Sequence, residues 1–318
     1  MGEFELIDEI VAQLGDAADS PAVINGPGDD AAVLAVPEGH HLVTSVDTLV
    51  ADLHFPREAP PELIAQRAMR ISVSDLAAMG AEPLAAVIAL VLPQHTSVGW
   101  VRGLSQGFAD ASKALGCPVT GGNLTAGELS ISVTVQGVVP AGQAILRSGA
   151  RAGDSVWVGG ALGGAATALN QGNLARVGAD RLSLDAAQTH YYLPPPQIEL
   201  GVALRSIATS AIDISDGFAA DLGHIAASSA VAVELEEVAI PSFPGATRAA
   251  VLHGGDDYLL CFTAPPEYSS AILELAPGAQ AVGVCVPWKA QFKSRLILDG
   301  KPLVASGFDH FSSVSDGG

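Results

Sequence analysis

Acidic residues in this chain gather at the ends of expected strands and in glycine turns. Three groups stand within one stretch: Gly28-Asp29-Asp30, Ser45-Val46-Asp47-Thr48 and Ser74-Asp75. Each group alone is more often an ordinary turn or helix cap, but three in one segment with few basic neighbours favour a shared role. Mg²⁺ would supply the missing positive charge, because it takes oxygen ligands and keeps waters or substrate phosphates as its other ligands.

The second half of the chain carries acidic groups of the same kind. These are Asp213-Ile214-Ser215-Asp216-Gly217 and Gly254-Gly255-Asp256-Asp257. Phosphoryl transfer needs mainly positioning and charge neutralisation, which metal ions held by carboxylates provide. An acceptor that is itself a phosphate is already ionised near pH 7 and needs no protein base. Carboxylate-rich motifs that offer few candidate bases therefore favour metal-assisted transfer to a phosphate.

Two common phosphate-binding signatures are absent from the sequence. No Gly-x-x-x-x-Gly-Lys-Ser/Thr loop is present, and neither is the protein-kinase motif set. The glycine-rich turn from Gly159 to Gly164 lacks the spacing of a dinucleotide fingerprint. These absences leave the Asp clusters as the chemistry-bearing feature.

The charge balance of the chain argues against two classes of binding partner. Lys and Arg number 15 against 34 Asp and Glu, which gives a formal net charge of -19. Nucleic-acid binding needs a basic face, so we expect no nucleic acid and no membrane partner. No apolar run approaches the ~20 residues that cross a bilayer. Cys117, Cys261 and Cys285 form neither a zinc pattern nor a disulfide framework, which predicts a cytoplasmic location.

The elements that must position these groups indicate two α/β (α+β) domains, with the boundary expected after residue 148. The expected domains are therefore 1–148 and 149–318. The pattern in the first predicts helices at 4–14, 60–79 and 98–115 and strands at 31–36, 41–46, 84–92 and 129–139. Asp75 then falls near a helix C-terminus, where the macrodipole disfavours a carboxylate and a bound cation would compensate.

The second domain shows a similar coarse order of strands and helices. Residues 170–190 are expected to form a loop or a helical insertion. The patterns predict strands at 155–158, 231–235, 258–263, 280–286 and 294–298, and helices from Pro194 to about 208, after Gly217 to about 228, and over 266–275.

The motifs resemble those of thiamine-monophosphate kinases, within the superfamily of aminoimidazole-ribonucleotide synthetase. The resemblance runs from Gly2 to Phe311 and is carried by Gly28-Asp29-Asp30, Ser45 to His54-Phe55, Ser74-Asp75 to Ala81, Arg147-Ser148-Gly149-Ala150, Asp213 to Gly217, Gly254 to Tyr258 and Gly307-Phe308-Asp309-His310-Phe311. It implies a two-domain fold in which each domain is a mixed sheet packed with helices. It also implies a homodimer joined through the N-terminal domains, and direct transfer of the ATP γ-phosphate to thiamine monophosphate.

The resemblance also assigns roles residue by residue. Catalysis would rest on Asp30, Asp47, Asp75 and Asp213, and Mg²⁺ would be held by Asp30, Ser45, Val46, Asp47, Asp75, Asn123, Asp213 and Asp216. ATP would contact Gly122, Asn123, Arg147 and Ser215, and thiamine monophosphate would contact His54, Asp256 and Phe308. By residue type alone, His54 fits an ordinary packed histidine and Phe308 fits a core aromatic equally well.

Four positions depart from the family pattern. Asn123 replaces an Asp, Asp256 and Leu259 replace two Glu, and Ser72 replaces an Asn. An amide oxygen carries no charge, so we expect one metal to bind more weakly. Two alternatives stay open: a non-catalytic nucleotide-binding homologue with an impaired metal site, or a kinase or synthetase of the superfamily with another substrate.

Overall fold

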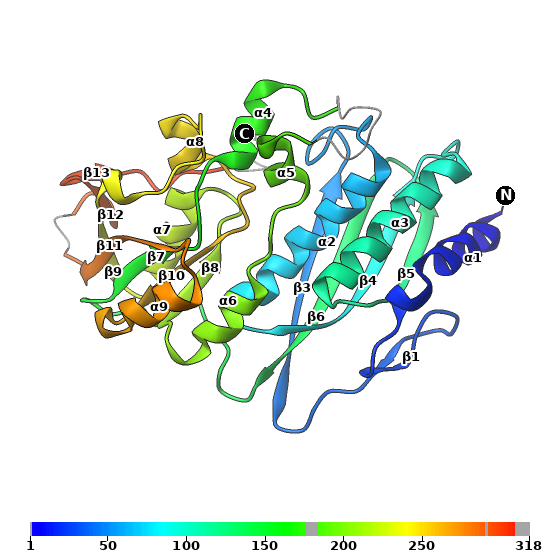
Figure 1. Cartoon of the computed structure of the whole chain (residues 1–318), viewed down its shortest axis with the longest axis horizontal. Helices are drawn as coiled ribbons and strands as arrows, with labels where there is room; N and C mark the ends of the chain where they lie inside the picture. Colours follow the sequence, from blue (N-terminus) through cyan, green and yellow to red (C-terminus); the bar gives the residue numbers. More distant parts are fainter. Residues whose placement is uncertain (1, 176–183, 290–291, 309–318) are drawn as a thin grey trace, which may run out of the picture. The chain divides into compact units, whose positions relative to one another are not determined.

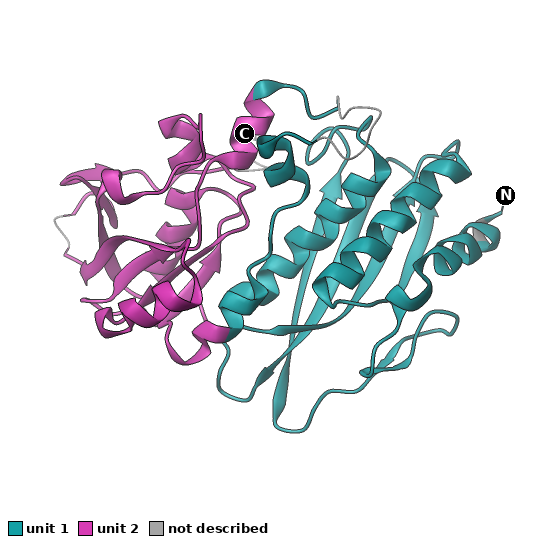
Figure 2. Cartoon of the chain, viewed as in Figure 1, with its two compact units in different colours: residues 1–144, 171–202 teal, residues 145–170, 203–318 magenta. Residues whose placement is uncertain are grey.

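The computed structural model describes residues 2–175, 184–289 and 292–308 (Figure 1). The chain forms two compact units (Figure 2). Unit 1 comprises residues 1–144 and 171–202, and unit 2 comprises residues 145–170 and 203–318. The segment 171–202 therefore packs with unit 1, although it lies in sequence between two pieces of unit 2. The functional boundary after residue 148 stays a prediction.

Unit 1 is built on a mixed four-stranded sheet in the order β3-β6-β4-β5, in which β4 and β5 run parallel and the other pairs antiparallel. A separate antiparallel pair joins β1 to β2. The elements are α1 (Glu3–Leu14), the 3-10 turn Gly15–Ala18, β1 (Val23–Asn25), β2 (Val33–Leu34), β3 (His40–Val50), α2 (Pro61–Ala78), β4 (Glu82–Leu92), α3 (Val98–Leu115), β5 (Val119–Ala126), β6 (Ser130–Pro140), α5 (Ala186–Tyr192) and α6 (Ile198–Ala203).

Helices α2 and α3 cover one face of this sheet (Figure 1). Because side chains alternate along a strand, Ser45, Asp47 and the buried Leu49 of β3 lie on the helix-covered face. Val46 lies on the opposite face with 60% of its surface exposed. The acidic motif of β3 is thus directed toward α2.

Local capping explains where the two covering helices begin and end. The Ser97 hydroxyl accepts the Trp100 N–H at 3.2 Å at the start of α3, and Gly116 closes that helix with φ 60°. Pro61 opens α2, which ends at Ala78. The observed bounds of α3 are those predicted from the sequence.

Unit 2 contains a mixed seven-stranded sheet in the order β13-β12-β9-β11-β7-β10-β8, where β12 and β9 are parallel. Its core lies between this sheet and helices that include α7, whose Phe218, Leu222 and Ile225 are fully buried. The elements are β7 (Ser155–Val158), α4 (Gly164–Gln171), the 3-10 turn Leu204–Ser206, β8 (Ser210–Asp213), α7 (Phe218–Ser228), β9 (Val231–Leu235), the 3-10 turn Glu237–Ala239, α8 (Arg248–His253), β10 (Leu260–Ala264), the 3-10 turn Pro266–Tyr268, α9 (Ser269–Leu275), β11 (Gln280–Pro287), β12 (Leu296–Leu298) and β13 (Lys301–Leu303).

Some expected elements differ from the observed ones. The strand expected over 31–36 is reduced to β2, and the one expected over 41–46 extends to Val50. The helix expected from Pro194 begins at Ile198. Strand β5 and helix α8 were not expected. Within the described part of the chain, no helix is both long and apolar enough to cross a bilayer.

Candidate active site

Unit 1 brings Ser45, Asp47 and Asp75 together between β3 and the last turn of α2. The Ser45 hydroxyl donates a short hydrogen bond to Asp75 Oδ2. Burial, and next the charge of Asp75, raise the pKa of Asp47 to about 6, while a hydrogen bond from the Ser72 side chain opposes the shift. The Asp47 and Asp75 carboxylates therefore repel each other in a partly buried place.

This donor set fits a hard divalent cation. Two carboxylates and a hydroxyl offer only oxygen, which is what Mg²⁺ prefers, and the raised pKa of Asp47 reflects the burial and like charge that a cation would offset. Among the described residues, no group of three or more His, Cys, Asp or Glu is arranged to hold a metal. Unit 1 therefore supplies part of the predicted ligand set.

Two further predicted ligands of unit 1 are Asp30 and Asn123. Asp30 is exposed in the loop between β1 and β2, where its N–H donates to Asp29 Oδ1 at 2.9 Å. Asn123 is exposed on β5. Neither hydrogen-bonds to Asp47 or Asp75 in the described chain. The side chain of Val46 lies on the other face of the sheet, so Val46 could reach a metal only through its backbone.

His54 lies in the tight loop that follows β3. Its own N–H donates to the Val50 carbonyl at 2.9 Å, and the Val50 N–H donates to His54 Nδ1 at 3.0 Å. Because Nδ1 accepts this bond, the neutral imidazole carries its proton on Nε2. Nε2 is thus a hydrogen-bond donor suited to a phosphate oxygen.

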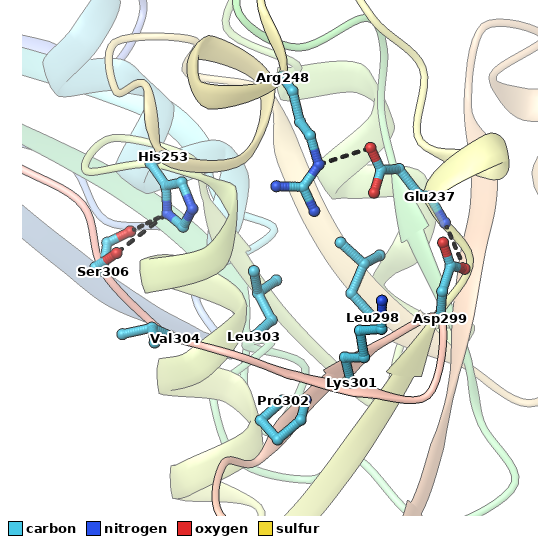
Figure 3. Close-up of a pocket in the computed structure, with 10 residues that line it drawn as sticks. All are labelled: Glu237, Arg248, His253, Leu298, Asp299, Lys301, Pro302, Leu303, Val304 and Ser306. Carbon is cyan, nitrogen blue, oxygen red and sulfur yellow. Dashed lines mark hydrogen bonds and ion pairs between the residues drawn. The ribbon is translucent and has the colours of Figure 1, made fainter.

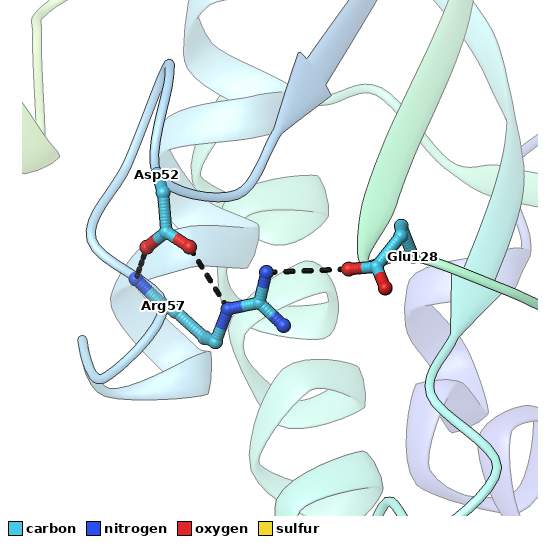
Figure 4. A network of polar contacts seen from close by, with 3 residues as sticks. All are labelled: Asp52, Arg57 and Glu128. Atoms are coloured by element: carbon cyan, nitrogen blue, oxygen red, sulfur yellow. Dashed lines mark hydrogen bonds and ion pairs between the residues drawn. The ribbon is translucent and has the colours of Figure 1, made fainter.

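An exposed ionic network braces the same loop (Figure 4). Arg57 Nε lies 2.9 Å from Asp52 Oδ2, and Arg57 Nη2 lies 3.3 Å from Glu128 Oε2 in the turn between β5 and β6. Asp52 adopts φ 63° and accepts the Arg57 N–H at 3.1 Å. Hydrogen bonds and charge from Arg57 hold the pKa of Asp52 below its usual range. Such exposed pairs add little stability, so their role is to fix the shape of the loop.

In unit 2 three predicted motifs meet at the loop that joins β8 to α7. Asp213 is buried at the end of β8. The Ser215 carbonyl accepts the Asp256 N–H at 2.8 Å, and the Asp216 carbonyl accepts the Phe308 N–H at 2.9 Å. The structure thus brings Ser215, Asp216, Asp256 and Phe308 together. Asp309, His310 and Phe311 of the last motif lie outside the described residues.

Two glycines permit this close approach. A Cβ on Gly255 would lie 2.3 Å from the Ser215 carbonyl oxygen, and one on Gly307 would lie 2.1 Å from that of Asp216. Asp256 and Tyr258 adopt φ 70° and φ 50°, and the Tyr258 hydroxyl donates to Asp256 Oδ1 at 3.1 Å. Left-handed backbone at non-glycine residues costs free energy and gathers at functional sites.

Two buried aspartates to which the sequence analysis assigned no role hold the loops of unit 2. Asp221 Oδ2 accepts the N–H groups of Asp216 and Gly217, both at 3.1 Å. Burial, and next the charge of Asp216, raise the pKa of Asp221 to about 7, against backbone hydrogen bonds that lower it. The sequence offered one signal for this role. Asp221 stands in the first turn of the helix after the Ser-Asp-Gly motif, where a carboxylate can accept hydrogen bonds from backbone N–H groups.

The second of these residues is Asp257. Its carboxylate accepts the N–H groups of Gly163 at 2.7 Å and Gly164 at 3.1 Å, where α4 begins. A protein carboxylate therefore already occupies the backbone donors that a phosphate would need at this glycine turn. This agrees with the missing dinucleotide fingerprint.

The remaining predicted ATP contacts are Arg147 in unit 2 and Gly122 in unit 1. Arg147 is exposed, and in the described chain its guanidinium makes no ion pair, while its carbonyl accepts the Ser229 hydroxyl at 3.3 Å. Gly122 lies on β5, where a Cβ would come 2.0 Å from the Ile88 carbonyl oxygen. Leu259, which replaces a Glu of the family pattern, is buried in the unit 2 core, where an apolar side chain is favourable.

A cavity of about 390 Å³ borders the motif junction of unit 2 (Figure 3). Arg248 Nε pairs with Glu237 Oε1 at 2.7 Å on its wall, and His253 Nδ1 lies 2.9 Å from the Ser306 carbonyl oxygen. His253 and Ser306 directly precede Gly254 and Gly307. The predicted site residues do not line this cavity.

Comparison with known proteins identifies the fold and the family. Residues 28–139 match the AIR synthase related protein, N-terminal domain. The thiamine-monophosphate kinase of Haemophilus influenzae is 38% identical over 326 residues and 98% of each chain is covered. The crystal structure of thiamine-monophosphate kinase from Stenotrophomonas maltophilia K279a is 36% identical with a TM-score of 0.84, covering 95% of this chain and 98% of that one.

A third relative is a solved complex of AaThiL with AMPPCP and TMP. It is 29% identical with a TM-score of 0.77, and 98% of this chain and 97% of that chain are covered. The fold is accordingly that of the AIR synthase-like proteins, as expected from the sequence. Within that class, the chain belongs to the thiamine-monophosphate kinase family.

Proposed function

We propose that this chain is an ATP-dependent thiamine-phosphate kinase, which transfers the γ-phosphate of ATP directly to thiamine monophosphate and yields thiamine diphosphate. The observation that carries the proposal is identity of 38% to a thiamine-monophosphate kinase across 98% of both chains. The AaThiL complex with AMPPCP, an ATP analogue, and TMP supports the same pair of substrates.

We also propose that the acidic residues would hold Mg²⁺ for the transfer. Asp47, Asp75 and the Ser45 hydroxyl would hold it in unit 1. The other proposed ligands are Asp30, the Val46 backbone and Asn123 of unit 1, and Asp213 and Asp216 of unit 2. When bound, Mg²⁺ neutralises phosphate charge and orients the reacting oxygens. The Asp47 carboxylate, partly buried beside the charge of Asp75, would be stabilised by the positive charge of such an ion.

The other proposed roles belong to polar groups described above. The exposed Arg147 guanidinium suits an ATP phosphate because its planar donors match phosphate oxygens, and the backbones of Gly122 and Ser215 would contact the nucleotide. His54 would donate from Nε2 to the phosphate of thiamine monophosphate. Asp256 would pair with the cationic heterocycle and Phe308, 51% exposed, would stack on it.

The deciding experiment is a coupled ADP-release assay of the full chain with ATP and Mg²⁺. Thiamine monophosphate should give turnover, while thiamine, aminoimidazole precursors and selenide should give none. Binding of ATP in a calorimeter without turnover of thiamine monophosphate would instead support a non-catalytic nucleotide-binding homologue. Turnover with another acceptor would support a superfamily enzyme of different substrate.

Restoring the family's Asp at position 123 should change the metal requirement. Asn123→Asp adds a charged ligand, so we expect the Mg²⁺ concentration for half-maximal rate to fall by about two- to tenfold at unchanged KM for thiamine monophosphate. Titrating Mg²⁺ at saturating substrates measures this. An equal or higher Mg²⁺ requirement would exclude Asn123 from the metal site.

We further propose a homodimer formed through the uncovered face of the unit 1 sheet. Leu42, Val46 and Val50 of β3 expose 50%, 60% and 37% of their surfaces on that face. Gln136 Oε1, in register with Thr44, is buried there without a hydrogen-bond partner among the described residues. Apolar exposed faces of this kind mark interaction surfaces.

The three cysteines are buried and free, which supports a cytoplasmic location.

A further inference from the structure

The carbonyl oxygen of His54 accepts hydrogen bonds from two side chains that are remote in sequence. Tyr191 Oη donates to it at 2.7 Å and Arg67 Nε at 3.3 Å. Tyr191 is 2% exposed and Arg67 is 1% exposed. The backbone of the loop that follows β3 is therefore anchored to a buried pair.

Arg67 and Tyr191 also fix each other. Arg67 Nη1 donates to the Tyr191 carbonyl at 2.7 Å, and the guanidinium carbon lies 3.9 Å from the centre of the Tyr191 ring. A planar guanidinium stacked on an aromatic ring and bonded at two of its nitrogens has little freedom to rotate. The pair is thus a rigid support for the His54 carbonyl.

Both ends of His54 are held as a result. Tyr191 and Arg67 fix its carbonyl, and the Val50 N–H fixes ring atom Nδ1 at 3.0 Å. A side chain held within a small angle by such supporting hydrogen bonds points its Nε2–H in one direction.

We propose that Tyr191 and Arg67 are positioning residues for thiamine monophosphate, which act by orienting His54 toward the substrate phosphate. The inference rests on the proposed contact between His54 and that phosphate. It assigns a role to α5, whose segment returns to unit 1 from between the two pieces of unit 2. Removing the support should weaken substrate binding more than it slows the chemical step.

The adjacent tyrosine provides a matched control. Tyr192 is also fully buried on α5, but its hydroxyl donates to the Leu174 carbonyl at 2.7 Å. Tyr191→Phe keeps the ring under Arg67 and removes one hydrogen bond to His54. We expect it to raise KM for thiamine monophosphate by about three- to tenfold, with kcat and KM for ATP within about twofold. Tyr192→Phe should leave all three constants within about twofold of the wild type.

A double-mutant cycle separates positioning from general packing. In a His54→Ala background, Tyr191→Phe should raise KM for thiamine monophosphate no further, because the imidazole it orients is gone. The His54 ring signal in NMR spectra should shift in Tyr191→Phe and stay unchanged in Tyr192→Phe, a measurement that does not need activity. Equal KM in Tyr191→Phe and wild type, or equal rises in both tyrosine variants, would overturn the proposal.

Failure of the proposed function gives a different result. If the wild-type chain does not phosphorylate thiamine monophosphate, the function is wrong, and an unshifted His54 signal in Tyr191→Phe would separately reject the positioning role. If the wild type is active and Tyr191→Phe keeps its KM, only the positioning role is rejected.

Discussion

Asp75→Asn is expected to lower kcat for phosphorylation of thiamine monophosphate by about a thousandfold or more, which corresponds to ~4 kcal/mol of transition-state stabilisation. The substitution keeps an oxygen that can accept the Ser45 hydroxyl and changes little volume, so the last turn of α2 should stay intact. It removes one of the two crowded carboxylates that would hold Mg²⁺. Steady-state ADP release at saturating Mg²⁺ measures the loss.

The control for lost charge is Asp110→Asn. Asp110 is exposed on α3, where it accepts a hydrogen bond from Gln106 at 2.7 Å, and the variant has the same net charge as Asp75→Asn. Its kcat should stay within about twofold of the wild type because exposed substitutions outside a site have small effects. Comparable activity of the two variants would remove Asp75 from the proposed metal site.

Asp75→Asn should also change how the stability of the metal-free protein depends on pH. The folded-state pKa of Asp47, about 6, lies above its ordinary value of 3.8. The protonated carboxyl therefore stabilises the folded state below about pH 4, and this stabilisation is lost as the pH rises through about 6. The free energy of unfolding should fall by roughly 3 kcal/mol at most, and by less where solvent screens the charges. Asp75→Asn removes the repelling charge, so denaturation in chelator should show a shallower loss. Parallel curves for variant and wild type would contradict the charge coupling.

Gly255→Ala is expected to disrupt unit 2. Its Cβ would lie 2.3 Å from the Ser215 carbonyl oxygen, which is backbone and cannot rotate away. The loops must separate, and the 2.8 Å bond from the Asp256 N–H to Ser215 would be lost. We expect the free energy of unfolding to fall by about 3 kcal/mol and kcat to fall more than about a hundredfold. Urea denaturation and the ADP-release assay measure both.

Gly278→Ala is the matched substitution in the same unit. A Cβ at Gly278 meets nothing within 4 Å, so stability should change by less than about 0.5 kcal/mol. A Gly255→Ala protein as stable and active as Gly278→Ala would mean that the close approach of the two motifs is not required.

Much of the fold could be predicted where short-range signals set it. The bounds of α3 follow from Ser97 and Gly116 at its ends, and β9 is observed over the predicted residues. Strand β5 was missed because Gly121, Gly122 and Asn123 disfavour strands, and only its parallel pairing with β4 makes it one. That pairing is a long-range effect invisible in a short window.

The candidate site could likewise be predicted where motifs name its residues, but not where long-range packing supports them. The motifs named Asp47, Asp75 and the three loops of unit 2, and the structure brings the first two together and joins the loops. The supports of these residues could not be predicted. Tyr191 reaches His54 from a segment expected only as a loop or helical insertion, and the bond depends on packing between α2 and α5.

The path of the chain between its units has a consequence for biosynthesis. Residues 145–170 belong to unit 2, yet unit 1 is complete only when residues 171–202 have been added. On the ribosome, the nascent chain must therefore leave the Arg67 guanidinium without its tyrosine partner until Tyr191 emerges. Co-translational folding of the N-terminal unit cannot finish before part of the following unit is already outside the exit tunnel.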